Sequence, residues 1–150
     1  MKIIDGGVTA AKGFKAAGMH AGIKKGTKKD MAMIVSSAPC MAAGTFTTNL
    51  VKAAPVKWDQ HVVYEHGEAR AVVVNSGIAN ACTGAEGYGY CEETAKAAAE
   101  ALGIDKDEVL VASTGVIGKQ LPIDTIKKGV KDLFGLLLDT REAATLEIGR

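Results

Sequence analysis

Two valine-rich runs constrain the fold of this chain more than any other feature. Residues 71–74 and 108–113 each contain an unbroken apolar stretch, and such runs are typical of strands that are covered on both faces. A glycine-bearing loop and a helical pattern follow each run. Alternating strands and helices predict a layered α/β fold, and a length of 150 residues predicts one domain, residues 1–150, with a substantial core.

The remaining elements are expected from shorter patterns. Three further strands are predicted at residues 2–4, 30–37 and 41–48. A helix is expected after Thr83, because Thr83 and Glu86 have the spacing of a capping box, and Gly103 suits its C-terminal end. A second helix is expected from Pro122, since proline favours the first helical position. Its apolar stripe consists of Ile123, Ile126, Val130, Leu133 and Leu137.

Composition and charge exclude several classes of protein. Hydrophobic residues make up 47% and charged residues 23%, which is typical of a globular chain. The formal net charge of +1 argues against broad binding to nucleic acid, and we expect the basic segment at residues 24–29 to be a solvated loop. No apolar run approaches the ~20 residues that cross a bilayer, and no secretory signal is recognisable. We therefore expect neither a nucleic-acid nor a membrane partner.

The cysteines and histidines predict no disulfide and no metal site. Cys40, Cys82 and Cys91 are an odd number without CxxC spacing, so we expect reduced thiols, each a small buried hydrophobe, in a cytoplasmic protein. The histidines show neither an HxxH nor an HExxH arrangement. These are His20, His61 and His66. No metal or other cofactor is therefore expected.

The first candidate site lies where the second valine-rich run ends, at Ser113-Thr114-Gly115. One interpretation is an ordinary turn. The other is a backbone loop whose N–H groups converge on an anion, with a threonine hydroxyl as an extra donor and a glycine that permits close approach. Such a loop can also stabilise an oxyanion during acyl transfer. Neither GxxxxGK[ST] nor a GxGxxG motif after a strand is present to indicate a nucleotide site.

The second candidate site is the loop NSGIANACTG after the first valine-rich run. Asn75, Ser76 and Asn80 either bond neighbouring backbone and hold the loop in shape or contact a substrate directly. Both loops follow the C-terminal ends of strands, the usual place for a ligand crevice in α/β sheets. The chain has no GxSxG motif and no histidine close in sequence to these residues. It therefore offers an oxyanion site without an evident nucleophile.

Four ordered segments resemble a known family. GGVTAAKGFKAAGMHAGIK, SSAPCMAAGTFTTN, AVVVNSGIANACTG and VLVASTGVIGKQLP are similar to signature segments of the ornithine acetyltransferases, which are the glutamate N-acetyltransferases of arginine biosynthesis. The similarity runs from about Gly6 to the helix after Pro122. In one departure, Ile78 stands where the family usually has asparagine, so no polar contact is expected from that position.

The resemblance implies a fold and a reaction. The fold is an αββα sandwich completed by a second chain, usually in an α₂β₂ assembly. The precursor cleaves itself, and the N-terminal threonine of the β chain takes acetyl from N-acetylornithine and passes it to glutamate in a ping-pong reaction, giving ornithine and N-acetylglutamate. The resemblance assigns the oxyanion hole to Thr114 and Gly115. Some members also use acetyl-CoA as a co-substrate.

This resemblance explains why a nucleophile is missing. An N-terminal threonine can use its own α-amino group as a base, so no histidine is needed. The cleavage junction is expected after Arg150, and neither Thr140 nor Thr145 is expected to be the nucleophile. Two alternatives stay open at this point. They are a related self-processing aminopeptidase and a non-catalytic α/β module that binds a small molecule or anion.

Overall fold

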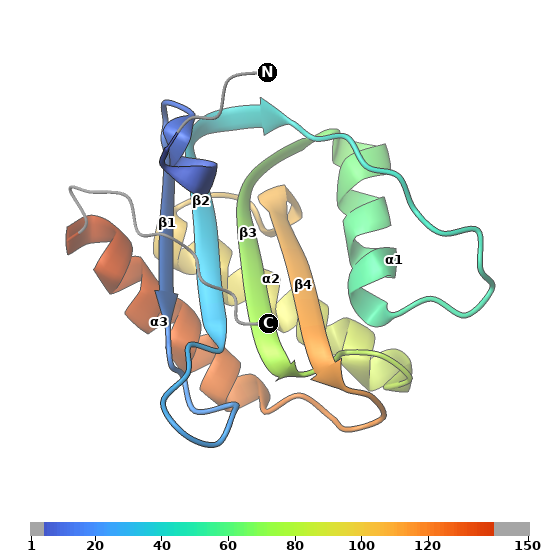
Figure 1. The fold of residues 1–150 in the computed structure, drawn as a ribbon. Helices are drawn as coiled ribbons and strands as arrows, with labels where there is room; N and C mark the ends of the chain where they lie inside the picture. Colours follow the sequence, from blue (N-terminus) through green and yellow to red (C-terminus); the bar gives the residue numbers. More distant parts are fainter. Residues whose placement is uncertain (1–4, 140–150) are drawn as a thin grey trace.

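The computed structural model describes residues 5–139, which form one sheet with helices packed against it (Figure 1). The expected strand at residues 2–4 and the residues Thr140 and Thr145 lie outside this range. In chain order the elements are η1 (Gly7–Ala10), β1 (Phe14–Met19), β2 (Met31–Met41), α1 (Ala54–His61), η2 (Val62–His66), β3 (Glu68–Ile78), α2 (Gly84–Leu102), η3 (Lys106–Glu108), β4 (Val109–Val116) and α3 (Ile123–Asp139).

The described sheet has four strands in the order β1-β2-β3-β4. The pairs β1–β2 and β2–β3 are antiparallel, and a register shift interrupts β2 between Val35 and Cys40. The two valine-rich runs form β3 and β4, which pair in parallel. A parallel pair needs a crossover connection, and α2 supplies it. The C-terminal ends of the two strands therefore lie side by side at the same end of the sheet.

One face of the sheet packs against α2 and α3, which both lie behind it in Figure 1. Successive side chains of a strand point to opposite faces. The paired residues Ala17, Met33, Val73 and Val111 point to the helices, and none is more than 4% exposed. Their neighbours Ile34, Val72 and Leu110 point to the other face and are half-buried. Among residues 5–139, helices thus cover one face of the valine-rich strands rather than both.

This arrangement confirms the α/β class. The described residues form one sheet layer and one helical layer, which is half of the αββα sandwich that the family resemblance implies. The predicted helices are present as α2 and α3. The stripe expected on α3 is buried at Ile126, Val130, Leu133 and Leu137, because it faces the sheet. None of the described helices is long and apolar enough to span a bilayer.

The ends of α2 match the prediction only in part. Gly103 adopts the left-handed conformation with φ 68°, and its N–H donates to the Ala99 carbonyl at 2.8 Å, as expected of a glycine at this position. The predicted capping box is wrong. The Thr83 hydroxyl donates instead to Oδ1 of Asn80 at 2.6 Å and makes no cap bond, because the nearby buried amide competes for it.

Three segments differ from the prediction. Residues 42–49 form no strand. Phe46 instead packs edge-on against Tyr64 of η2, with ring centroids 5.4 Å apart. The structure also contains β1 and α1, which the patterns did not predict. β1 (Phe14–Met19) is rich in alanine and lacks the β-branched residues typical of strands. α1 does carry a start signal, Pro55 in its first turn.

The cysteines occupy three different environments. Cys91 is 2% exposed in the core, as expected. Cys40 is half-buried, and Cys82 is exposed, so the expectation that every cysteine is buried is wrong for Cys82. Cys82 lies in the loop before α2, where its backbone is left-handed with φ 57°.

Candidate active site at the ends of β3 and β4

The two predicted loops lie together at one end of the sheet. The parallel register pairs Asn75 with Ser113, Ser76 with Thr114 and Gly77 with Gly115. Beyond the strands, the Ala79 N–H donates to the Val116 carbonyl at 2.9 Å, and the Gly118 N–H donates to the Ala81 carbonyl at 3.2 Å. We call residues 75–80 and 113–118 the strand-end site. Both candidate segments of the sequence thus belong to one place.

The pair Asn75 and Ser113 points to the helical face and is bonded within the protein. The Ser113 hydroxyl donates to Oδ1 of Asn75 at 2.6 Å, and Nδ2 of Asn75 donates to the Ile78 carbonyl at 2.9 Å. Asn75 is 4% exposed, and Ile78 is 7% exposed in the core. These bonds favour a structural role for Asn75 over direct contact with a substrate.

Asn80 also holds the loop in shape. Asn80 is 1% exposed. Its Nδ2 donates a hydrogen bond to the Gly87 carbonyl at 2.7 Å, and its Oδ1 accepts a hydrogen bond from the Thr83 hydroxyl. A carboxamide buried with its donor and acceptor both engaged has no free group for a ligand. Of the two interpretations of this loop, the geometry therefore favours the self-bonded connector for Asn80 as well.

The pair Ser76 and Thr114 points the other way. Strand alternation places both side chains on the face that α2 and α3 do not cover. Thr114 is exposed. Ser76 is 8% exposed, and its N–H donates to the Asp30 carbonyl at 2.8 Å. The candidate hydroxyl of Thr114 is thus open to an incoming group, whereas Ser76 is fixed against the segment before β2.

Gly115 lies where no other residue fits. Its φ is 134°, and a Cβ built on it would overlap the carbonyl of Gly77 and contact the N atom of Ile78. Only glycine tolerates both the backbone angle and the approach. Gly77 faces it with φ 120°. The two opposed glycines bring the ends of β3 and β4 closer together than side chains would allow.

β4 is the last strand of the sheet, so one of its two edges does not pair with β3. Helix α1 covers only the first half of this outer edge. Nε1 of Trp58 donates to the Val109 carbonyl at 2.8 Å, and the Val111 N–H donates to Oδ1 of Asp59 at 3.0 Å. Burial raises the pKa of Asp59 to about 6, although the bond from Val111 opposes this rise. Within residues 5–139, no side chain makes a comparable bond to this edge beyond Val111. The Ser113–Gly115 end of the strand edge is therefore open.

The helical side of the strand-end site offers no room for a ligand. The cavity there, lined by residues including Asn80, Cys91 and Ser113, measures about 10 Å³, which is about the least space that holds one water molecule. Burial and the charge of Asp59 raise the pKa of the Cys91 thiol to about 12, so this cysteine is not a nucleophile. Any chemistry at the strand-end site must take place on the opposite face or at the open edge.

A basic side chain also borders the strand-end site, which the sequence patterns did not indicate. The loop at residues 20–30 folds back because the carboxylate of Asp30 accepts the N–H groups of Ala21 at 2.6 Å and Lys24 at 2.8 Å. Burial disfavours the Asp30 anion, but these N–H bonds outweigh it and lower its pKa. A Cβ at Gly77 would lie 3.0 Å from Cγ of Lys24. The stem of Lys24 therefore packs over the strand end, while residues 25–29 are exposed as expected.

Residues that could hold a metal ion lie at the other end of β4. His61, His66 and Asp107 bring their ligand atoms within 4.8 Å of one another. Spacing along the sequence did not indicate this group, because the two histidines are five residues apart and the aspartate follows about forty residues later.

Fold and site together define an α/β protein whose open centre lies at the ends of two parallel strands, on a face that its own helices leave uncovered. The chain belongs to the ArgJ family, whose profile matches residues 15–147. It is 51% identical over 144 residues to the arginine biosynthesis bifunctional protein ArgJ of Gloeobacter violaceus, covering 96% of this chain and 36% of that protein. It is 52% identical over 134 residues to the protein of the same name from Dehalococcoides mccartyi, covering 88% of this chain and 33% of that protein.

Two solved structures share the fold. One is the arginine biosynthesis bifunctional protein argJ of Bacillus halodurans, with a TM-score of 0.82, 42% identity, and coverage of 91% of this chain and 68% of that chain. The other is the ornithine acetyltransferase of Mycobacterium tuberculosis in complex with ornithine. It has a TM-score of 0.82 and 46% identity, and the match covers 91% of this chain and 76% of that chain. The present chain spans about a third of the length of the curated relatives named above.

Proposed function

We propose that this chain supplies the oxyanion-binding part of a glutamate N-acetyltransferase in arginine biosynthesis. In this proposal the complete enzyme transfers acetyl from N-acetylornithine to glutamate. Membership of the ArgJ family supports the pathway, and the likeness to an ornithine acetyltransferase solved with ornithine supports the substrate class. The observation that carries the assignment to this chain is the open Thr114-Gly115 end of β4, opposite Gly77.

The two proposed donors differ in kind. Thr114 contributes its exposed hydroxyl. Gly115 contributes its backbone N–H, which by strand alternation lies on the same edge as the N–H of Val111, the edge that faces away from β3. When a nucleophile attacks the acetyl carbonyl, negative charge develops on its oxygen, and donors already in place stabilise that charge in the transition state. A side chain at residue 115 would force the strand ends apart and displace both donors.

The nucleophile in this proposal is the N-terminal threonine of a second chain, cut from the same precursor, in an α₂β₂ assembly. Its hydroxyl attacks the acetyl carbon while its own amine takes the proton. The acyl-enzyme bond forms as the C–N bond to ornithine breaks and ornithine leaves as the amine. Glutamate then attacks the ester, and the threonine hydroxyl is regenerated with N-acetylglutamate as the product. Acetyl-CoA is a further acetyl donor that fits the same acyl-enzyme chemistry.

Exposed apolar side chains beside the proposed donors support a partner chain. Val116 is 61% exposed and Ile117 is 65% exposed. Leu50 and Val51, in the segment that leads to α1, are also exposed, at 97% and 75%. Exposed apolar residues next to a polar site, such as Val116 and Ile117, are typical of surfaces that another polypeptide covers. In the proposal, that polypeptide closes the strand-end site and excludes water from it.

Substitution of Thr114 tests the oxyanion role in the complete enzyme. Thr114→Ala removes the hydroxyl, and we expect kcat for acetyl transfer from N-acetylornithine to glutamate to fall about 10²–10³-fold with little change in KM, which is typical for loss of one such donor. Thr114→Ser retains the hydroxyl and is the matched control, with kcat within about tenfold of the wild type. A Thr114→Ala enzyme with normal kcat and raised KM would assign Thr114 to substrate binding instead.

A further inference from the structure

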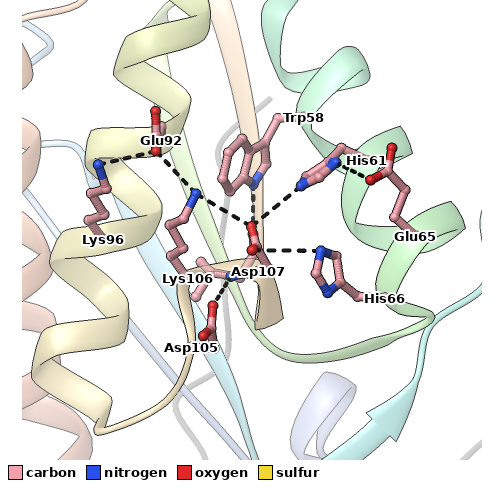
Figure 2. Close-up of polar contacts among 10 residues, drawn as sticks. Trp58, His61, Glu65, His66, Glu92, Lys96, Asp105, Lys106 and Asp107 are labelled. Atoms are coloured by element: carbon pink, nitrogen blue, oxygen red, sulfur yellow. Dashed lines mark hydrogen bonds and ion pairs between the residues drawn. The ribbon is translucent and has the colours of Figure 1, made fainter.

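Two imidazoles and a carboxylate form a cluster near the start of β4 (Figure 2). Nε2 of His61 is 3.6 Å from Oδ1 of Asp107, and Nε2 of His66 is 3.6 Å from Oδ2 of the same carboxylate. The two imidazole rings meet edge to face with centroids 5.2 Å apart. Three side chains from two separate segments thus converge on one point.

The local helix geometry explains why the histidines meet. In an α-helix, residues five apart are rotated by roughly 140° and face different directions. Here the helix continues as the π-helical turn η2 (Val62–His66), and the Gly67 N–H donates to the Val62 carbonyl five residues earlier at 3.0 Å. Because its hydrogen bonds join residues five apart, a π-helical turn is wider than an α-helical turn and holds more than 3.6 residues. This reduces the rotation between His61 and His66, and their rings meet.

The spacing of the three groups suits a bound cation better than direct hydrogen bonds. A nitrogen that donates to a carboxylate lies about 2.7–3.2 Å from it, so neither imidazole bonds Asp107 directly. Oδ1 of Asp107 is buried and accepts no hydrogen bond. Two ligands of a tetrahedral Zn²⁺ with bonds near 2.0–2.1 Å stand about 3.3 Å apart. The two imidazole–carboxylate distances of 3.6 Å are close to this value, and the ligand atoms of all three residues lie within 4.8 Å of one another.

The groups around the cluster complete the pattern of a metal site. Nδ1 of His61 lies 3.2 Å from Oε2 of Glu65, and such a carboxylate fixes the tautomer that leaves Nε2 free to bind a metal. Nζ of Lys106 lies 3.7 Å from Oδ1 of Asp107, but Glu92 holds it at 3.1 Å and it lies over the Trp58 ring. Figure 2 shows Lys106 on the side of Asp107 away from His66.

We propose that His61, His66 and Asp107 form a binding site for Zn²⁺ or a similar divalent transition-metal ion, with the two Nε2 atoms and the carboxylate of Asp107 as ligands. The ion would tie α1 and η2 to the start of β4. The strand from Val109 to Thr114 spans about 17 Å, so the ion would stabilise the fold without touching the strand-end site. The proposal is therefore independent of the acetyltransferase assignment.

Metal titration of the complete protein tests this proposal. After removal of metals with a chelator, we expect isothermal titration calorimetry at neutral pH to show one Zn²⁺ per chain and no binding of Mg²⁺, which prefers oxygen ligands. Co²⁺ should give the visible absorption of a tetrahedral site. His66→Gln and Asp107→Asn should abolish both signals, and Glu65→Gln should weaken Zn²⁺ binding about 10- to 100-fold.

The control is His20→Gln. His20 pairs with Asp30 and lies outside the cluster, so its removal should leave Zn²⁺ binding unchanged. Circular dichroism without metal identifies any variant that fails to fold. If Asp107→Asn does not fold, His66→Gln decides, since His66 is 41% exposed. Absence of Zn²⁺ binding by the wild type, or equal affinity in the wild type and His66→Gln, would overturn the proposal.

Discussion

At the scale of single residues, the strand-end site depends on which way each side chain points. Asn75 and Ser113 point to the helical face of the sheet, where they are hydrogen-bonded to each other. Their chain neighbours Ser76 and Thr114 point to the opposite face. A polar cluster in the sequence is thus divided by strand alternation into a structural half and a candidate chemical half. Of the four, only Thr114 presents an exposed hydroxyl.

Asp59 gives a prediction about pH. Burial raises its pKa from 3.8 to about 6 in the folded protein, so the folded state binds more protons than the unfolded state between these values. The stability that Asp59 contributes is full below about pH 4 and is lost as pH rises through about 6. Between these pH values the free energy of unfolding falls by at most about 3 kcal/mol. The fall is smaller than this limit because water screens the part of the carboxylate that is not buried.

Urea unfolding at a series of pH values measures this effect. Asp59→Asn cannot ionise and keeps an acceptor for the Val111 N–H, so the difference in unfolding free energy between variant and wild type should shift in favour of the variant from pH 4 to pH 7. Asp132→Asn, which removes a surface carboxylate paired with Lys128, is the matched control and should show no comparable shift. A pH-independent difference for Asp59→Asn would contradict the prediction.

At the scale of elements, α3 packs on the sheet through a narrow apolar stripe. Gly129 lies directly against Met31 of β2, where a Cβ would overlap the methionine sulfur. Leu133, one turn further along the helix, is 0% exposed. Close approach at the glycine lets the neighbouring leucine fill the space between helix and sheet. The stripe was predictable from the sequence, but this close approach was not.

Truncation of Leu133 tests the packing of α3. Leu133→Ala should lower the free energy of unfolding by about 2–5 kcal/mol, because it removes buried methyl groups and leaves a cavity. Leu136→Ala on the same helix is the control. Leu136 is 40% exposed, so its truncation should cost less than about 1 kcal/mol. Equal effects of the two substitutions in chemical denaturation would mean that the stripe does not carry the packing.

At the scale of the whole molecule, helices cover one face of the described sheet and leave a row of half-buried aliphatic side chains on the other. Under the proposed function, the isolated chain of residues 1–150 should therefore bind the dye ANS, and should not transfer acetyl from N-acetylornithine to glutamate. Addition of the partner chain should lower the dye fluorescence and restore turnover. Turnover by the isolated chain would refute the division of the centre between two polypeptides.

The sequence by itself determined the elements that have strong local signals. The valine runs predicted β3 and β4, the spacing of leucine and isoleucine predicted α3, and Gly103 predicted the end of α2, because each signal lies within a few residues of its effect. The weak signals were missed or misassigned. β1 is too rich in alanine to be recognised. Of the strand predicted at residues 41–48, only Met41 joins the sheet, as the last residue of β2.

Only the tertiary structure decided what depends on contacts between distant segments. It joined the two loops at one strand end, set Gly115 against Gly77, turned Asn80 toward Thr83 and Gly87 rather than toward solvent, and brought Asp107 to His61 and His66. No local pattern encodes these pairs, because strand register and helix rotation fix them across tens of residues. The residue types of the candidate site were present in the sequence, but their directions came from the fold.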